Sequence, residues 1–319
     1  MRTHPTVPDQ APPVAADPGR RQHYADFYEL HAADGHAADG HAADLTGVVF
    51  GNCQAESLRQ FLPASVHWVR MPPVHELGAD DIPYLDRLLD RTDVIISQPV
   101  RDDYHGLPLG TGQLFARVRD LSARLVVPVI RFAGLYPTHA IIRPPSDASL
   151  VPPLVAYHDL HTLAEAAGDP LPGLTADSVR EIAALSIREL QSREQRFDAI
   201  PVSDVFAQPG FDQMRTINHP GNPVWESLAK RVIDRLGLDD GPVDPGRPLL
   251  DSVHAPRHPA VVDSWSLDVE PTEYWIVEGA QVPEEERHRI HLEWYRSHPD
   301  VVAAGLRRHE SALRLLASS

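Results

Sequence analysis

The sequence predicts an α/β protein, in which a parallel sheet carries helices on both faces and a helical elaboration follows toward the C-terminus. Two observations predict this class. Between residues 45 and 132, short apolar runs alternate with segments whose apolar residues recur at helical spacing. Strands that alternate with helices are typical of a parallel sheet covered on both faces, a three-layer core. Beyond residue 175 the helical spacing dominates.

Each element has its own signal. Apolar runs predict strands at 45–50, 66–69, 93–97 and 125–132. Helical spacing predicts helices between these strands, at 53–62, 82–89 and 114–121. In the second half it predicts helices at 179–190, 222–236, 284–297 and 300–317.

The N-terminal segments show no such periodicity. Residues 1–22 are rich in Pro, Ala and Asp, a composition typical of disordered chain, and residues 31–44 read HAADGHAADGHAAD. A five-residue step rotates a helix by about 500°, so the repeated histidines would not converge on one metal ion. We therefore expect a disordered tail at 1–44, an α/β domain at 45–240 and a helical extension packed on it at 241–319.

The composition excludes several classes of protein. The net charge is −16, from 45 acidic and 29 basic residues, which argues against a broad nucleic-acid-binding surface but leaves room for a local basic pocket. The single cysteine permits no internal disulfide. The N-terminus has no apolar signal segment, and no run approaches the roughly 18 apolar residues of a membrane helix. We expect a cytoplasmic protein without a membrane span.

The only cysteine, Cys53, lies where the first predicted strand meets the first predicted helix. Free N–H groups at a helix N-terminus favour the thiolate and could hold a developing oxyanion. The side-chain amides of Asn52 and Gln54 add hydrogen-bond donors. The alternative is a small buried apolar residue, the usual state of a free cysteine.

A nucleophile of this kind needs a base. Among the 18 histidines, His219 lies in a short loop just before a strongly predicted helix, where a side chain can be held and still be exposed. His288 and His291 share a helical face with Glu284. No third metal ligand accompanies them, so we expect a solvated helix face there and no metal site.

Further candidates follow the predicted strands, because ligands bind outside the carboxyl ends of parallel strands. Gln98 could donate to an oxyanion or to a sugar hydroxyl. Thr111 and Gly112 open the third predicted helix, whose free N–H groups could accept a phosphate, although no P-loop sequence follows. The other candidates expected at this edge are Arg101, Tyr104 and Arg131.

Five blocks of sequence, GNCQ, SQP, IRFAGLYP, AYHD and INHPGNPV, occur in this order between about residues 45 and 240. Together they resemble the WcbI family of capsular polysaccharide biosynthesis proteins. The resemblance implies a flavodoxin-like/SGNH-like fold, distantly similar to SGNH/GDSL hydrolases. It also implies coenzyme A binding and O-acetyl transfer to a sugar.

The resemblance implies roles for single residues. Cys53 stands where SGNH enzymes keep their serine nucleophile, and His219 stands in the place of their final histidine. Those enzymes carry an aspartate three residues before that histidine, where this chain has Thr216. Asp159 is a possible substitute, or Cys53 and His219 work as a dyad. Tyr157 and His158 of AYHD are expected to bind substrate with Asn52, Gln54 and Gln98, and the phosphates of coenzyme A are expected at Arg101, Tyr104, Thr111, Gly112 and Arg131.

The function expected from these residues is acyl transfer from acetyl-CoA to a hydroxyl of a sugar or polysaccharide precursor. Either Cys53 carries the acyl group covalently, or His219 activates the hydroxyl while nearby amides hold the oxyanion. With water as acceptor, the same residues would make an esterase or thioesterase. A third alternative is a non-catalytic carbohydrate- or nucleotide-binding module, in which Cys53 would be buried and unreactive. No metal is expected.

Overall fold

The structure, a computed structural model, describes residues 18–30, 45–144, 146–147 and 149–318. The repeat at 31–44 and the first 17 residues of the predicted tail lie outside the described residues. The chain divides into two compact units, residues 1–125 and 126–319, each with its own hydrophobic core. The division at residue 240 that the sequence suggests stays a prediction.

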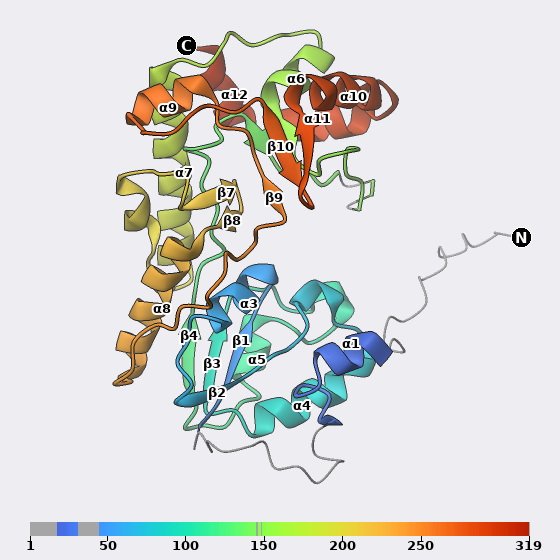
Figure 1. Cartoon of the computed structure of the whole chain (residues 1–319). Helices are drawn as coiled ribbons and strands as arrows, with labels where there is room; N and C mark the ends of the chain where they lie inside the picture. The colour runs from blue at the N-terminus through green and yellow to red at the C-terminus, as the bar shows by residue number, and fades with distance from the viewer. Residues whose placement is uncertain (1–17, 31–44, 145, 148, 319) are drawn as a thin grey trace, which may run out of the picture. The chain divides into compact units, whose positions relative to one another are not determined.

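A four-stranded parallel sheet forms the centre of the first unit (Figure 1). The strand order is β2-β1-β3-β4. From β1 the chain first goes to β2 on one side and then crosses to β3 on the other, so β1 and β3 flank the switch point where ligands bind in open α/β sheets. The strands are β1 (Leu45–Phe50), β2 (Val66–Val69), β3 (Val94–Ser97) and β4 (Ala123–Val126). The predicted α/β class is confirmed.

Helices flank this sheet. Val48 and Ile95 pack in one core cluster with Leu85 and Leu114 of two of the helices. Because side chains alternate along a strand, Val49 and its neighbours point to the opposite face. The helices are α3 (Cys53–Arg59), α4 (Ile82–Asp90) and α5 (Thr111–Phe115), with short 3₁₀ turns η2 (Val74–Glu76), η3 (Ala79–Asp81) and η4 (Tyr104–Gly106).

Two predicted elements of the first unit are wrong. The helix expected at 114–121 ends at Phe115, and Leu121 is fully exposed. The strand expected at 125–132 is β4, which begins at Ala123 and ends at Val126. The N–H of Ala123 pairs with the carbonyl of Asp93, which sets where the strand begins, and Pro128 has no N–H with which to continue it.

Residues 18–30 are ordered, which corrects the prediction of a disordered tail up to residue 44. The helix α1 (Pro18–His23) is followed by Phe27, which is completely buried in the core of the first unit. The carboxylate of Asp81 accepts hydrogen bonds from Arg20 (3.1 Å) and from the hydroxyl of Tyr28 (2.7 Å). Buried aromatic residues and a buried ion pair therefore fix this segment.

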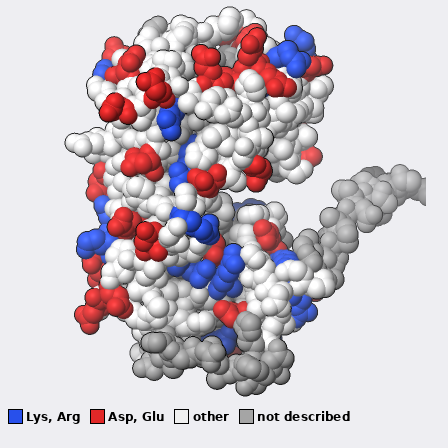
Figure 2. Space-filling view, viewed as in Figure 1, with Lys and Arg blue, Asp and Glu red and all other residues white. Residues whose placement is uncertain are grey.

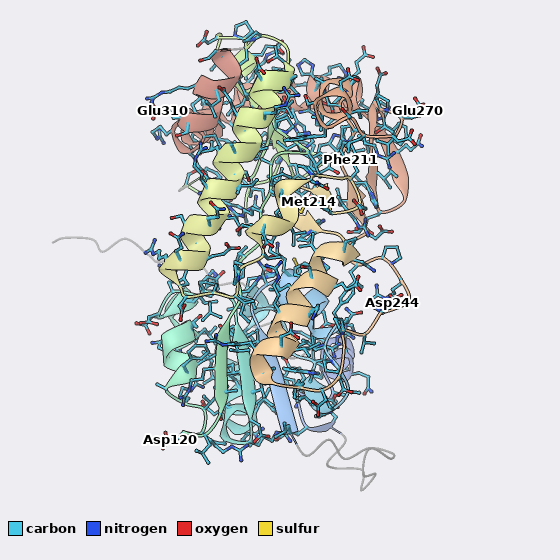
Figure 3. All side chains as sticks on the ribbon, turned by 90° about the vertical axis from the view of Figure 1, so that its left-hand side faces the viewer. Asp120, Phe211, Met214, Asp244, Glu270 and Glu310 are labelled. Carbon is cyan, nitrogen blue, oxygen red and sulfur yellow. The ribbon has the colours of Figure 1, made fainter. Side chains whose placement is uncertain are left out.

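The second unit is mainly helical, and α7 and α8 are its longest helices (Figure 3). Beside them, the hydroxyl of Tyr136 donates to the carbonyl of Met214, and its ring packs on Phe211. The predicted helix at 300–317 is broken at His309. The helices are α6 (Leu160–Ala166), α7 (Ala176–Arg196), α8 (Asn222–Leu236), α9 (Pro259–Trp265), α10 (Glu284–Ser297), α11 (Pro299–Arg308) and α12 (Glu310–Ala317), with η5 at Ser203–Ala207.

Small antiparallel sheets position loops in this unit. Two are two-stranded, and the third has the order β11-β10-β9. They are formed by β5 (His139–Ala140) with β6 (His158–Asp159), β7 (Met214–Thr216) with β8 (His219–Pro220), and β9 (Val253–His254), β10 (Tyr274–Val277) and β11 (Ala280–Pro283).

The surface matches the acidic composition. Acidic side chains are spread over the face of the second unit seen in Figure 2. Among the helices that the structure describes, none is both long and apolar enough to cross a membrane.

Candidate functional site

The carboxyl ends of β1 and β3 are joined by side-chain amides. The N–H of Asn52 donates to Oε1 of Gln98 (2.9 Å), and Nε2 of Gln98 donates to Oε1 of Gln54 (3.2 Å). Gly51 makes room for this arrangement, because a Cβ at this position would lie 2.3 Å from Oε1 of Gln98. Both glutamines are buried. Their amides therefore fix the shape of the switch point, and their role toward a substrate stays a prediction.

Cys53 begins α3 at this switch point, and its side chain is exposed. The alternative of a buried packing residue is therefore wrong. Enough protein surrounds the thiol that loss of solvent raises the pKa of Cys53, while hydrogen bonds from the N–H groups of Cys53 and Gln54 lower it. The predicted stabilisation of the thiolate by N–H groups is present, but the net direction is upward. The free thiol therefore needs a base before it can act as a nucleophile.

The predicted phosphate-binding residues of the first unit differ in accessibility. The hydroxyl of Thr111 donates to the carbonyl of Gln98 (2.8 Å), which ties the start of α5 to the end of β3. That hydroxyl is therefore committed within the protein. Arg101 and Gly112 are exposed, and Tyr104 is half-buried.

His219 lies on β8, beside a chain of hydroxyl groups. The hydroxyl of Tyr157 lies 3.3 Å from Nε2 of His219, donates to Oδ1 of Asn218 (2.8 Å) and accepts from Oγ1 of Thr216 (2.9 Å). Thr216, at the position where the SGNH aspartate would stand, thus reaches the imidazole through Tyr157. Sequence reasoning assigned Tyr157 to substrate binding and missed this linking position.

Burial lowers the pKa of His219 to about 4, and the neighbouring charges of Arg215 and His254 act in the same direction. The imidazole is therefore neutral at pH 7, the form that can accept a proton. Among the described residues, its buried Nδ1 has no hydrogen-bond partner.

Asp159 has a different role from the third member of a triad. It is the N-cap of α6, where Oδ1 accepts from the N–H (2.8 Å) and the hydroxyl (3.0 Å) of Thr162. Burial disfavours the carboxylate, but the nearby charges of Arg287 and His139 and local hydrogen bonds prevail and lower the pKa of Asp159 to about 2. These contacts suit a structural anion. The catalytic role suggested for Asp159 stays a prediction.

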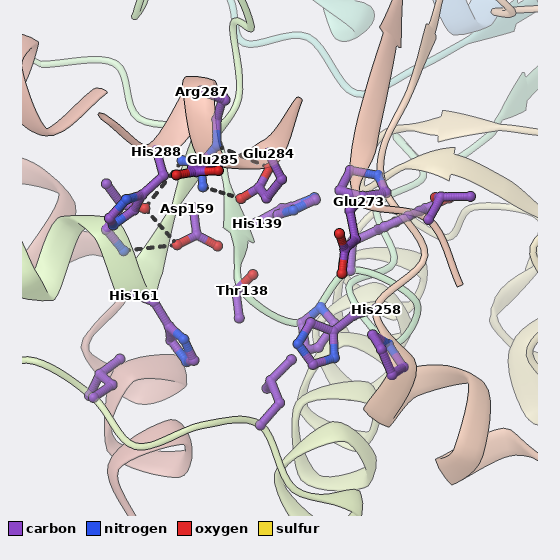
Figure 4. Close-up of a pocket in the computed structure, with 18 of the residues that line it drawn as sticks. Thr138, His139, Asp159, His161, His258, Glu273, Glu284, Glu285, Arg287 and His288 are labelled. Carbon is purple, nitrogen blue, oxygen red and sulfur yellow. Dashed lines mark hydrogen bonds and ion pairs between the residues drawn. The ribbon is translucent and has the colours of Figure 1, made fainter. Parts of the chain in front are cut away.

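Asp159 also lines a cavity of about 790 Å³ in the second unit (Figure 4). Arg287 forms an ion pair with Glu284 and donates to the hydroxyl of Thr162 (3.2 Å). His288 and Glu165 pair at 2.8 Å. The contacts of Arg287 with Thr162 and of His288 with Glu165 join α10 to α6. The described residues contain no cluster of three or more potential metal ligands.

The structure bears on two predictions about nearby histidines: the solvated face of the helix that carries His291, and the contact of His158 with substrate. The face of α10 that was expected to be solvated is buried at Arg287 and His291, and Nε2 of His291 lies 3.0 Å from the carbonyl of Pro153. His158 is buried, with Nδ1 2.7 Å from the hydroxyl of Tyr295, and burial lowers its pKa to about 3. His158 is therefore placed as a core residue, and its predicted contact with substrate is not tested.

Arg131 was expected at the carboxyl edge of the sheet, but β4 ends before it and Arg131 belongs to the second unit. There it lines a separate cavity of about 460 Å³ with Arg193 of α7 and Arg308 of α11. Arg193 and Arg308 were not among the residues predicted to bind phosphate. The only signal for Arg193 was its position on the helix row of Ile182, which also lines the cavity.

Comparison with known proteins agrees with this fold. Residues 46–241 match the family described as "Polysaccharide biosynthesis enzyme WcbI". No curated protein matched the chain. Among solved structures, the chain is similar to WcbI, described as a novel polysaccharide biosynthesis enzyme, with a TM-score of 0.70 and 20% identity over 85% of this chain and 99% of that chain. That structure is described as native protein without a disulfide bond between coenzyme A and one of its cysteines.

At this identity the structural likeness establishes the fold alone, while the match to the family extends over more than half of the chain. The chain therefore belongs to the WcbI family of polysaccharide biosynthesis enzymes.

Proposed function

We propose that the protein is an acyl-CoA-dependent O-acyltransferase that modifies a hydroxyl of a sugar or polysaccharide precursor, with acetyl-CoA as the simplest donor. The observation that carries this proposal is the exposure of Cys53 at the β1/β3 switch point. The related WcbI structure is described with reference to a disulfide between coenzyme A and a cysteine. Such a bond requires the two sulfurs to approach to about 2.05 Å. In this chain only Cys53 can supply that thiol.

The covalent route is balanced as a thioester exchange. A base takes the thiol proton of Cys53, the thiolate attacks the thioester carbonyl, and the C–S bond to coenzyme A breaks. The coenzyme A thiolate takes up the proton, and acetyl remains on Cys53 as a thioester. In the second half, the acceptor hydroxyl loses its proton to the base and attacks this thioester, which gives an O-acetyl sugar and restores the Cys53 thiol.

His219 is the proposed base. The raised pKa of Cys53 keeps the thiol protonated at neutral pH, and the lowered pKa of His219 keeps the imidazole neutral. In the direct route the same imidazole would activate the sugar hydroxyl, and Cys53 or the N–H groups beside it would stabilise the tetrahedral oxyanion.

The test combines binding with detection of the acyl-enzyme. Calorimetric titration of coenzyme A and acetyl-CoA into the wild type, Cys53→Ala and Cys53→Ser measures binding. Intact-protein mass spectrometry after incubation with acetyl-CoA detects one added acetyl group. We expect binding in all three proteins and acetylation in the wild type alone. His219→Ala should slow acetylation at least a hundredfold, whereas His288→Ala, which removes a half-buried histidine that pairs with Glu165 in the same unit, should not.

The outcomes separate the alternatives. Coenzyme A release that depends on an added sugar supports transfer, while release into water alone supports an esterase or thioesterase. Acetyl transfer to a sugar by Cys53→Ala would select the direct route. If the wild type binds neither coenzyme A nor acetyl-CoA, the acyltransferase proposal is wrong.

A further inference from the structure

Three arginines from distant parts of the sequence meet around one cavity of the second unit. Arg131 follows β4, Arg193 lies in the last turn of α7, and Arg308 ends α11. The cavity that they line, called here the arginine cavity, has a volume of about 460 Å³. This lies within the range of small-molecule sites. In a protein of net charge −16, three arginines around one cavity suggest a site for an anionic ligand.

Only one nearby acid, Glu189, attracts both Arg131 and Arg193, and it forms no ion pair with either of them among the described residues. Within the described residues, no ion pair joins any of the three to a carboxylate. Glu189 is the acid that lines the cavity with them. The carboxylate of Glu194, the next acid on α7, accepts from the N–H groups of residues 202 and 203 and from a serine hydroxyl, so it is committed elsewhere.

Two buried nitrogens of the arginine cavity have no hydrogen-bond partner among the described residues, and one of them, Nε of Arg193, is an obligate donor. Nε of Arg193 and Nε2 of His309 are inaccessible to solvent, and neither atom forms a hydrogen bond with the described residues. A buried polar group without a partner is costly, and native proteins avoid it unless a ligand or water completes the site. Burial lowers the pKa of Arg131, although part of the side chain is exposed, and the charges of Arg308 and Arg193 lower it further. Arg308 and Arg193 therefore both repel Arg131 when no anion is bound, and Glu189 offsets this repulsion in part.

The arginine cavity also has an apolar part. Phe132, Ile182 and Ile217 are among the residues that line it. Arg131 and Arg308 are exposed and Arg193 is half-buried, so the positive charge of the cavity is accessible from solvent. A ligand that fits would carry a multiply charged anion joined to an organic group. Guanidinium groups bind phosphate oxygens in a bidentate manner, which favours phosphate over a single carboxylate.

We propose that the arginine cavity is a binding site for an organic phosphate, held by Arg131, Arg193 and Arg308. The phosphate could come from coenzyme A or from a nucleotide-linked sugar, which share this chemistry. Binding at this site does not require Cys53, so the proposed phosphate site can be tested separately from the proposed acyl transfer.

The test is equilibrium binding to the full chain, by calorimetry at low and high salt. The probes are coenzyme A, 3′-dephospho-coenzyme A, UDP-glucose and inorganic pyrophosphate. Arg193→Gln and Arg308→Gln should weaken binding of at least one probe tenfold or more, and added salt should weaken binding to the wild type. Arg307→Gln makes the same charge change on the exposed neighbour of Arg308 and should bind as the wild type does.

The variants also have a readout independent of the ligand. Because Arg193 and Arg308 repel Arg131, Arg193→Gln and Arg308→Gln should unfold at the same temperature as the wild type or at a higher one, which excludes misfolding as the cause of weak binding. If the variants bind coenzyme A more weakly than the wild type does, but bind 3′-dephospho-coenzyme A equally well, the 3′-phosphate is the group that the arginines hold. If the variants bind only UDP-glucose more weakly than the wild type does, the ligand is a nucleotide-linked sugar. If all probes bind Arg193→Gln and Arg307→Gln equally, or none binds the wild type, the proposal is wrong.

Discussion

The hydroxyl of Tyr157 lies 3.3 Å from Nε2 of His219 and accepts a hydrogen bond from Thr216. A neutral tyrosine hydroxyl, and not a carboxylate, therefore lies beside the imidazole. A carboxylate would stabilise the imidazolium, and a hydroxyl does so far less. This agrees with the lowered pKa of His219, about 4.

Tyr157→Phe tests this arrangement. The ring should keep its stacking on Trp275, whose centroid is 5.7 Å away, while the hydrogen bonds of the hydroxyl are lost. Loss of one orienting hydrogen bond is worth about 1 kcal/mol, so kcat for acetyl transfer should fall about 5- to 10-fold. The KM for acetyl-CoA should change little. Tyr274→Phe, on β10 of the same unit, is the control. An unchanged kcat in Tyr157→Phe would show that the hydroxyl does not orient the base.

The thiol of Cys53 should titrate above the ordinary cysteine pKa of about 8.5. The rate of alkylation by iodoacetamide follows the thiolate fraction, so it should still be rising at pH 9 in the folded protein. The chain unfolded in urea is the control, because its thiol is fully solvated and should titrate near the ordinary value. A midpoint below 8.5 in the folded protein would mean that the N–H groups of α3 outweigh desolvation.

Gly51→Ala should damage the switch point. The new Cβ would lie 2.3 Å from Oε1 of Gln98, so the amide network must shift, at a cost of about 1–3 kcal/mol in the free energy of unfolding. Gly78→Ala is a matched control in the same unit, since nothing lies within 4 Å of a Cβ there. Thermal unfolding of both variants measures the difference. Equal melting temperatures would show that the network adapts without cost.

Much of the first unit could be predicted from sequence because its signals are local. The strands at 45–50 and 66–69 match β1 and β2, since short apolar runs between turns suit a buried parallel sheet. These strand assignments also predicted that Cys53 and Gln98 lie at the same, carboxyl edge of the sheet, because the ends of adjacent parallel strands meet there. The start of β4 was missed because it depends on pairing with Asp93, a tertiary contact that periodicity does not show.

The second unit could be predicted less well because its sites depend on distant contacts. Arg131, Arg193 and Arg308 come together only when α7 and α11 pack into one unit. Arg287 looks like a surface residue in a charged helix, yet its ion pair with Glu284 and its contact with Thr162 allow it to be buried. No local pattern distinguishes such a residue from a solvated one.

Phe27→Ala tests whether residues 18–30 belong to the core of the first unit. The ring is completely buried, so its removal should lower the free energy of unfolding by about 3–5 kcal/mol. Leu121→Ala, which truncates a fully exposed apolar residue of the same unit, should leave stability unchanged. Urea unfolding measures both. A Phe27→Ala variant as stable as Leu121→Ala would support the disordered tail that the sequence suggested.

Asp159→Asn separates a structural anion from a catalytic one. Asparagine can still cap α6, so the substitution removes mainly the charge beside Arg287. The pKa of Asp159 is lowered to about 2, against about 3.9 in an unfolded chain, so the carboxylate adds up to about 2.6 kcal/mol of stability. This contribution is fully present above the unfolded pKa and is lost as the pH falls through the folded pKa.

Unfolding of the wild type and of Asp159→Asn should therefore differ most at pH 6–7 and converge between pH 4 and 2. Asp240→Asn, an exposed residue of the same unit, should behave as the wild type does. Acetyl transfer by folded Asp159→Asn should stay within a fewfold of the wild type, because Asp159 bonds to Thr162 and acts on α6. If kcat instead falls as far as in His219→Ala while the melting temperature is unchanged, Asp159 acts on the base and the dyad is a triad.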